Sequence, residues 1–219
     1  MKRSMGLRQL MINKDMKASD ISKQNEIVDY VIKGGIFMAL PQKQFYTAED
    51  YWSLPEDVKA ELIDGQIYYH AAPSRIHQKI SSELNAVIRN YIRSKDGVCD
   101  VYAAPFAVTL NKDKRTIVEP DISVICDRNK LTDKGCTGAP DWIIEIISPG
   151  NPGHDLIYKL HLYADAGVRE YWIVDPRTQT VLVYYLEQKD FYVKTYTFHD
   201  KIKVNIYEDL WIDFQDFNL

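Results

Sequence analysis

The stretch Glu119–Tyr163 constrains this chain more than any other, because it places charge inside strands. Two apolar runs of strand character, Ile117–Cys126 and Asp141–Ser148, each carry an interior carboxylate, Asp121 and Glu145. A charged group among β-branched residues is costly unless it is paired or bound to a metal ion. If the strands are neighbours, the two carboxylates converge and repel unless a proton or a divalent cation lies between them. This pair is therefore the first candidate for a functional site.

A predicted helix after the second strand supplies a candidate cation. Asp155, Lys159 and Tyr163 are spaced at i, i+4 and i+8, so they share one face of a helix over Asp155–Ala166. From that face the lysine can reach back to the end of the sheet. The structural alternative is an ordinary helix ion pair between Asp155 and Lys159, worth about 0.3–0.5 kcal/mol when exposed.

Hydrophobic periodicity and turn residues predict an α/β fold, a sandwich on a mixed sheet. The apolar run Trp142–Ile147 has the character of a central strand buried on both faces. Together with the following helix and strand it predicts a right-handed parallel crossover. The other predicted elements are a short helix opened by a capping box at Thr47 and Asp50, a hairpin at Asp64-Gly65, a helix from Pro73-Ser74 to about Arg93, strands over Val98–Leu110, Ile117–Cys126 and Arg169–Val174, and a hairpin of Thr180–Leu186 with Tyr192–Thr197.

Length and composition fit one domain with a small appendage. The chain has 219 residues, of which 46% are hydrophobic, which is enough to bury a core. We expect residues 1–37 to form an N-terminal extension and residues 38–219 to form the domain. The extension is interpreted either as a mobile leader, with Met38 as the functional beginning, or as a short amphipathic helix over Ser19–Lys33 ended by Gly34-Gly35.

Several protein classes are disfavoured by the sequence. No apolar run approaches the roughly 18 residues that span a bilayer, and no secretory signal is visible, so no membrane partner is expected. The three cysteines, Cys99, Cys126 and Cys136, are odd in number and lack CxxC spacing. We therefore expect neither a zinc site nor a disulfide framework, and the expected compartment is the reducing cytoplasm.

The distribution of charge leaves the partner open. The first 37 residues carry seven Lys or Arg and four Asp or Glu, a net charge of +3. Because the whole chain has a net charge of −4, the remainder carries −7. An acidic body argues against non-specific adhesion to nucleic acid. It is compatible with a nucleic-acid enzyme whose acidic site is neutralised by metal.

The motif Glu119-Pro120-Asp121, followed by Glu145 on the next strand and by a nearby lysine, resembles the PD-(D/E)XK restriction-endonuclease-like superfamily. In that pattern the lysine follows the second acid by two residues, which is Ile147 here, so the chain departs from it. Lys159 would be a displaced form of that lysine, and in this respect the chain is similar to the Uma-type branch, a bacterial group regarded as endonucleases. Other matching segments, within a resemblance that covers about 45–196, are Glu61-Leu62-Ile63-Asp64-Gly65, His77, Ser148-Pro149, Asp155, Tyr163 and Gly167–Pro176.

The resemblance implies a restriction-endonuclease-like fold, a mixed β-sheet flanked by helices with an added C-terminal β-hairpin, and a Mg²⁺-dependent DNA endonuclease. Asp121 and Glu145 would bind Mg²⁺, or Mn²⁺ in its place, with the backbone carbonyl of Ile146 as a third ligand. Lys159 would position the nucleophilic water or help to deprotonate it. Because removal of one acid from such a cluster relieves repulsion, Glu145→Ala is expected to leave the melting temperature unchanged or slightly raised.

Three further residues are assigned supporting roles by the same resemblance, each with a structural alternative. Glu61 would bind metal directly or through water, or would simply flank a hairpin turn. His77 would contact phosphate or shuttle a proton, or would be a surface group at a helix start. Asp155 is a supporting residue, whereas Tyr163 and Trp172 are interpreted mainly as packing residues.

The alternatives for function depend on the position of Ile147. The leading hypothesis is a metal-dependent endonuclease with DNA as its partner, with RNA and a homodimer left open. Loss of the standard lysine at Ile147 favours instead a catalytically inactive nuclease-fold module that binds nucleic acid or a protein partner. Hydrolysis of another phosphate ester is the third hypothesis. No recognised DNA-reading element is visible, so the sequence argues for no base specificity.

Overall fold

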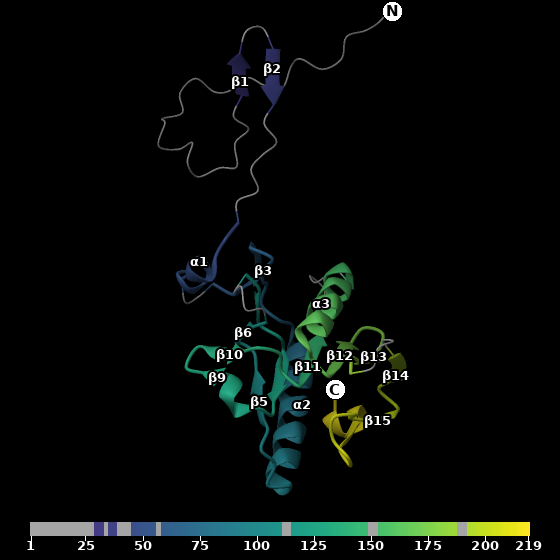
Figure 1. Cartoon of the computed structure of the whole chain (residues 1–219). Helices are drawn as coiled ribbons and strands as arrows, with labels where there is room; N and C mark the ends of the chain where they lie inside the picture. Colours follow the sequence, from purple (N-terminus) through teal and green to yellow (C-terminus); the bar gives the residue numbers. More distant parts are fainter. Residues whose placement is uncertain are drawn as a thin grey trace, which may run out of the picture. The chain divides into compact units, whose positions relative to one another are not determined.

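The computed structural model describes residues 29–32, 35–38, 45–55, 58–110, 115–148, 153–187 and 192–219, with backbone only at 29–38 and 153–156. The chain divides into two units, residues 1–44 and 45–219 (Figure 1). In the first unit, β1 (Asp29–Ile32) pairs antiparallel with β2 (Gly35–Met38). Where the sequence left open a helix over 19–33, residues 29–32 form a strand, which suits the β-branched Val31-Ile32. The earlier part of that predicted helix lies outside the described residues.

The second unit is built on a mixed six-stranded sheet in the order β14-β13-β12-β11-β8-β5. Its central strand β11 (Trp142–Ile146) is buried along its whole length, as predicted. β11 runs parallel to β12 (Glu170–Asp175), and helix α3 (Gly153–Ala166) connects them, which confirms the predicted parallel crossover. On its other side β11 pairs antiparallel with β8 (Ile122–Ile125). The strands carrying Glu145 and Asp121 are therefore direct neighbours.

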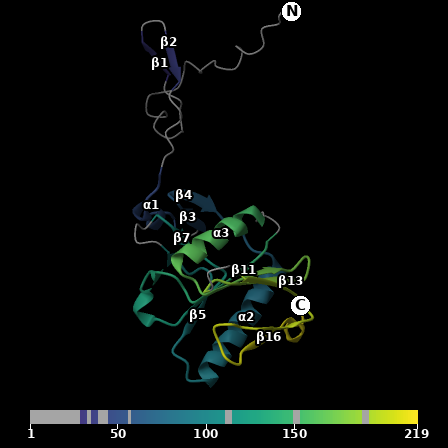
Figure 2. The same cartoon turned by 45° about the vertical axis from the view of Figure 1, so that its right-hand side comes forward.

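Two helices cover opposite faces of this sheet (Figure 2). On one face, α2 (Arg75–Ser94) packs its buried side against Trp142 and Ile144 of β11. On the other face, Tyr163 of α3 packs against Ile143 of the same strand. Because successive side chains of a strand point to opposite faces, Glu145 lies on the face that α3 covers. The buried positions of α2 are His77, Ile80, Ser81, Leu84, Ile88 and Ile92, which confirms the predicted amphipathic helix.

A second six-stranded sheet has the order β4-β3-β7-β6-β10-β9. Its hairpin of β3 (Ala60–Ile63) and β4 (Gln66–Tyr69) turns at Asp64 and Gly65, which have φ values of 47° and 75°. Two consecutive positive φ angles are the requirement of the tight turn that Asp-Gly predicts. Beside this sheet, α1 (Ala48–Trp52) begins at the predicted capping box of Thr47 and Asp50.

The two long strands predicted over 98–110 and 117–126 were wrong as single strands, because each is split between the sheets. The first becomes β5 (Asp100–Ala103) and β6 (Val108–Thr109), and the second becomes β7 (Ile117–Val118) and β8. Pro105 and Pro120 lie at the two breaks, and proline has no N–H to donate to a ladder. The antiparallel return was correct, since β6 pairs with β7 and β5 with β8.

The expectation that the cysteines form no disulfide was also wrong. Cys99 and Cys126 are joined, with an S–S distance of 2.07 Å. Cys99 precedes β5 and Cys126 follows β8, whose register pairs Asp100 with Ile125. The next cross-strand pair is then the two cysteines, which sequence spacing could not show. Cys136 is free and buried in β10 (Gly135–Thr137). The segment between β8 and β10 contains a 3₁₀ turn, Arg128–Lys130, and β9 (Leu131–Thr132).

The chain ends in two hairpins. The first, β13 (Thr180–Tyr185) with β14 (Tyr192–Thr197), was predicted and forms the edge of the mixed sheet. The second joins β15 (Lys201–Lys203) to β16 (Trp211–Asp213), and a 3₁₀ turn, Phe214–Phe217, follows. Ile202 and Ile212 of the second hairpin belong to the core on the α2 face. Within the described parts of the chain, no helix has the length and apolar character needed to cross a bilayer.

Candidate active site

Lys159 of α3 lies between two carboxylates that come from different sheets. Its Nζ atom is 2.8 Å from Oε1 of Glu61, on β3, and 2.9 Å from Oε1 of Glu145, on β11. None of the three residues is more than 5% exposed. Buried charges of this kind are tolerated only when they are paired and hydrogen-bonded. The predicted reach of Lys159 to the sheet is therefore present, and the lysine also joins the two sheets.

Both carboxylate oxygens of Glu61 have partners. Oε1 accepts a hydrogen bond from the backbone N–H of Glu119 at 2.9 Å, in addition to that from Lys159. Oε2 is 3.3 Å from Nε2 of His70. Burial would raise the pKa of Glu61, but the nearby Lys159 and His70 outweigh it and lower the pKa to about 2. The hydrogen bond to Glu61 in turn raises the pKa of His70 above its usual value. Glu61 is thus held as a fully bonded anion.

Glu145 is in a different electrostatic position. Tyr163 donates its hydroxyl to Oε1 of Glu145 at 2.7 Å, next to the bond from Lys159. Burial raises the pKa of Glu145, and although Lys159 opposes this, the charges of Asp121 and Glu61 add to it. No described residue donates a hydrogen bond to Oε2 of Glu145. Tyr163, interpreted from the sequence mainly as a packing residue, is fully buried and also orients this carboxylate.

Asp121 faces Glu145 across two neighbouring strands. The register pairs Ile122 with Ile144, so one further step of the antiparallel ladder places Asp121 opposite Glu145 on the same face. Oδ2 of Asp121 accepts a hydrogen bond from the backbone N–H of Ile146 at 2.7 Å. No described residue donates to its Oδ1. The sequence predicted that the carboxylates of Asp121 and Glu145 converge, and convergence requires both to lie on the same face of the sheet.

His77, in the first turn of α2, contacts Asp121. Its Nε2 atom is 3.1 Å from Oδ2 of Asp121, and its side chain is 7% exposed. If Nε2 carries the proton donated to Asp121, Nδ1 is an acceptor. Nδ1 is buried and has no partner among the described residues. The structure therefore places all five predicted side chains, Glu61, His77, Asp121, Glu145 and Lys159, in one connected group.

Two of the other predicted positions are less informative. The side chain of Asp155 lies outside what the structure describes, so its supporting role stays a prediction. Ile147, where the superfamily pattern has lysine, donates its backbone N–H to the carbonyl of Val174 at 2.8 Å and so extends the β11–β12 pairing.

The sequence did not single out two tyrosines and a histidine that surround this group. Tyr51 of α1 donates its hydroxyl to Oε1 of Glu119 at 2.7 Å. Tyr158 of α3 donates to Oδ2 of Asp64, at the hairpin turn. His70, which contacts Glu61, follows the strand that pairs with β3. His70 alone had a signal in the sequence, because the predicted hairpin brings the end of β4 beside Glu61.

A polar hollow of about 290 Å³ opens beside Asp121 and runs along α2. His77 and Asp121 lie in its wall together with Gln78, Asn85 and Arg89. Arg89 is 12 residues beyond His77, about 18 Å along the helix. The hollow, named here the α2 hollow, therefore extends from the carboxylate of Asp121 to the cation of Arg89.

The donor set fits a hard divalent cation bound by few protein ligands. Asp121 and Glu145 each keep one carboxylate oxygen without a hydrogen bond from any described residue. In the described parts of the chain, no group of three or more His, Cys, Asp or Glu side chains is arranged to bind a metal. Mg²⁺ commonly uses one or two carboxylates and retains several waters. Two carboxylates with one backbone carbonyl are consistent with that pattern, and a closed site of the zinc type is not.

Comparison with known proteins gives the family and the fold of the chain. A crystal structure of a "putative nuclease belonging to DUF820" from Anabaena variabilis superimposes with a TM-score of 0.65 and 26% identity, over 78% of this chain and 96% of that one. An uncharacterized protein of Synechocystis sp. is 26% identical over 161 residues, which are 71% of this chain and 83% of that protein. The model of the Uma2 family, described as "Putative restriction endonuclease", matches residues 47–215, and the chain belongs to this family.

Proposed function

We propose that this protein is a divalent-metal-dependent endonuclease that hydrolyses phosphodiester bonds in DNA. The observation that carries the proposal is the pairing of Asp121 and Glu145, each with a free oxygen, beside the buried cation of Lys159. A purely structural ion pair would satisfy the carboxylates on both oxygens, as Glu61 is satisfied here. Membership of a family described as "Putative restriction endonuclease" supports the same reaction class.

Asp121 and Glu145, with the backbone carbonyl of Ile146, would hold Mg²⁺, or Mn²⁺ in its place. Such an ion lowers the pKa of a bound water and offsets the charge that grows on the phosphate. The hydrogen bonds from Ile146 N–H and His77 to Oδ2 of Asp121 would keep its other oxygen directed at the metal. The hydrogen bonds from Tyr163 and Lys159 to Oε1 of Glu145 would hold that carboxylate in the same way.

Lys159 serves in this proposal as a fixed cation and not as a base. Burial would lower the pKa of Lys159, but the charges of Glu145 and Glu61 outweigh it and raise the pKa above its usual value. A lysine that keeps its proton this firmly does not accept one from water near neutral pH. Its proposed role is to orient Glu145 and to place positive charge beside the reacting phosphate. Glu61, whose oxygens are both bonded, is proposed to position Lys159 and not to bind metal.

The α2 hollow would receive the nucleic-acid backbone next to the cleaved bond. Arg89 offers a planar cation that matches a phosphate, and Gln78 and Asn85 offer amide donors. A second function, binding without cleavage, is favoured by Ile147 at the position of the superfamily lysine. The contact of Lys159 with Glu145 weighs against it, because that contact restores a cation to the site.

The test compares Asp121→Asn and Glu145→Gln with wild type on supercoiled plasmid DNA. Each change keeps the side-chain shape and removes one anionic ligand, so the rate in Mg²⁺ should fall by about 100-fold or more. Mg²⁺ should raise the melting temperature of wild type and of neither variant. Glu187→Gln is the control, because Glu187 is an exposed partner of Arg169.

Two outcomes would decide between the functions. Wild-type protein that cleaves no plasmid, linear duplex or single strand, and that Mg²⁺ does not stabilise, would contradict the enzyme proposal. Binding of the same DNA without cleavage would then establish the binding module. Cleavage that Glu187→Gln retains and both site variants lose would establish the nuclease.

A further inference from the structure

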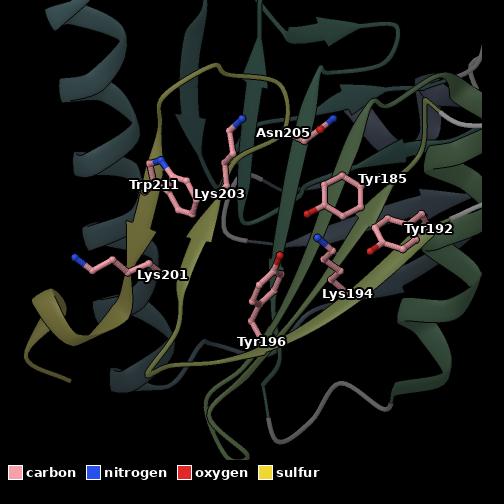
Figure 3. Close-up of a pocket in the computed structure, with 8 residues that line it drawn as sticks. All are labelled: Tyr185, Tyr192, Lys194, Tyr196, Lys201, Lys203, Asn205 and Trp211. Carbon is pink, nitrogen blue, oxygen red and sulfur yellow. The ribbon is translucent and has the colours of Figure 1, made fainter.

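A second hollow, of about 400 Å³, lies between β13–β14 and the C-terminal hairpin β15–β16 (Figure 3). Tyr185 of β13 and Tyr196 of β14 pack against the core on the α2 face of the sheet. Lys159 approaches the same sheet from the α3 face. The sheet therefore lies between this hollow, named here the C-terminal hollow, and the side chains of Lys159 and Glu145.

Strand alternation explains which side chains line the C-terminal hollow. On β14, Tyr192, Lys194 and Tyr196 occupy every second position and so share one face. On β15, Lys201 and Lys203 flank the buried Ile202 and point away from the core. Figure 3 shows Trp211 and Lys203 of the C-terminal hairpin on one side of the hollow, and Tyr185, Tyr192, Lys194 and Tyr196 of β13–β14 on the other.

The rings of the C-terminal hollow are accessible for stacking. Trp211 is 54% exposed and Tyr192 is 46% exposed. Tyr192 stacks on Tyr185, with ring centroids 5.4 Å apart and an interplanar angle of 27°. Single exposed rings are common on protein surfaces, whereas exposed rings gathered at one hollow are typical of a binding surface. The arrangement presents flat aromatic faces at the surface.

The lysines make the C-terminal hollow locally cationic in an acidic chain. Lys194 and Lys203 form no ion pair with any described residue, and the Nζ atom of Lys194 lies 5.5 Å from the ring centroid of Tyr192. Lys201 is 3.6 Å from Asp213, across the β15–β16 pair. No acidic side chain is among the described residues that line the hollow. The partner that matches this lining is an anion with flat, apolar faces.

We infer that the C-terminal hollow binds single-stranded nucleic acid, with bases stacked on Trp211 and Tyr192 and phosphates beside Lys194 and Lys203. Aromatic rings stack on any base, and lysines follow the backbone without base specificity. In a duplex the base faces are already stacked on one another, so the rings require unpaired bases. This inference goes beyond the proposed reaction, because the binding needs no metal and uses neither Asp121 nor Glu145.

The experiment measures binding of a fluorescently labelled oligo-dT by anisotropy in EDTA, so that no cleavage occurs. Trp211→Ala should weaken binding by about 10-fold, the usual scale for losing one base–aromatic stack, and Trp211→Phe should retain most of the affinity. Lys203→Glu should weaken binding. It should also reduce the slope of log K against log salt concentration by about 0.7 in magnitude for each phosphate contact that is lost. Oligo-dT should also quench tryptophan fluorescence, and Trp211→Ala should remove the quenching.

The matched controls are Trp52→Ala and Lys134→Glu. Trp52 is 40% exposed, and the Nζ atom of Lys134 lies 5.1 Å from its ring centroid, so this pair is chemically similar but lies outside the C-terminal hollow. Both controls should bind oligo-dT like wild type. Equal loss of affinity in the controls would overturn the inference.

Two competitors test the class of partner. A blunt duplex of equal length that binds as tightly as oligo-dT would contradict base stacking. Polyglutamate that competes as well as oligo-dT would show a site for polyanions only and would also overturn the inference. Failure here is distinct from failure of the nuclease: Glu145→Gln should bind oligo-dT normally even if no cleavage is found. A protein that cleaves DNA while Trp211→Ala leaves affinity and quenching unchanged would refute only the C-terminal hollow.

Discussion

At the scale of single residues, Lys159 decides the charge balance of the candidate site. Among the residues that the structure describes, Lys159 is the one cation bonded to both buried carboxylates, Glu61 and Glu145. His70 contacts Glu61 alone. The sequence suggested that Glu145→Ala relieves repulsion and leaves the melting temperature unchanged or raised. The structure removes the basis for that expectation, because Glu145 accepts bonds from Lys159 and Tyr163, and Glu145→Ala leaves the buried Tyr163 hydroxyl without its acceptor.

Removal of the cation should be strongly destabilising. Lys159→Met keeps the length of the side chain but leaves Glu61 and Glu145 as buried carboxylates without a shared cation. We expect the free energy of unfolding at pH 7 to fall by roughly 3–5 kcal/mol, the scale for breaking a buried ion pair. Urea denaturation of wild type and variant measures this difference in the free energy of unfolding.

A double variant is the control for this prediction. Lys159→Met combined with Glu145→Gln removes one of the two stranded charges, so it should be more stable than Lys159→Met alone. If Lys159→Met loses less than about 1 kcal/mol, the ion pairs seen here do not carry the stability assigned to them.

At the scale of elements, Glu170 of β12 anchors the connection between the last two strands. Its Oε2 accepts backbone N–H bonds from Asn205 at 2.7 Å and Ile206 at 3.0 Å. Its Oε1 accepts from Nε1 of Trp172 at 2.7 Å. Burial nevertheless raises the pKa of Glu170 from 4.5 to about 7, although these donors oppose the shift. One buried carboxyl group therefore links the mixed sheet to the hairpin that borders the C-terminal hollow.

The raised pKa predicts how stability changes with pH. Between pH 4.5 and about 7 the folded protein keeps a proton on Glu170 that the unfolded chain has lost. The contribution of this group to the free energy of unfolding therefore decreases as pH rises through that window. Glu170→Gln cannot ionise, so its urea midpoint should fall less over the same window than that of wild type.

Glu187→Gln should follow the wild-type pH profile, because Glu187 is nearly half exposed at the surface. If Glu170→Gln and wild type show the same decrease between pH 4.5 and 7, another group is responsible and the assignment to Glu170 is incorrect.

The disulfide ties the segment after α2 to the end of β8. Alkylation of unfolded, unreduced protein should modify one thiol, that of Cys136, and reduction should expose all three. In the folded protein Cys136 should react slowly even at pH 8, because burial raises its pKa to about 11. Intact-mass spectrometry counts the modified thiols, and three labels without reductant would show that the bond is absent. Reduction should cost about 3.5 kcal/mol of stability, given the 27-residue separation.

At the scale of the whole molecule, the unit over 45–219 contains every described contact of the candidate site. A chain that begins at Met38 keeps this unit complete. We expect its melting temperature to stay within about 2 °C of wild type, the change produced by about 0.5–1 kcal/mol, and its cleavage rate to stay within about 2-fold. Differential scanning calorimetry and plasmid cleavage measure the two quantities, and a 10-fold slower enzyme would assign residues 1–37 a part in the reaction.

The sequence by itself determined the elements whose signals are local. The capping box at Thr47, the Asp64-Gly65 hairpin and the amphipathic helix α2 each depend on residues within a few turns of one another. The parallel crossover that carries Glu145 and Lys159 was also predictable, because the strand, helix and strand follow one another directly and the handedness rule leaves one arrangement.

Only the tertiary structure decided the contacts between distant parts of the chain. Glu61 meets Lys159 across 98 positions, and Tyr51 meets Glu119 across 68. Local propensity does not determine which strands become neighbours, and it could not show that Pro105 and Pro120 divide two strands between sheets. The disulfide and the C-terminal hollow also depend on contacts between distant parts of the chain. Each requires side chains from separate hairpins or strands, and their spacing is set by the packing of the common core and not by the order of residues in the chain.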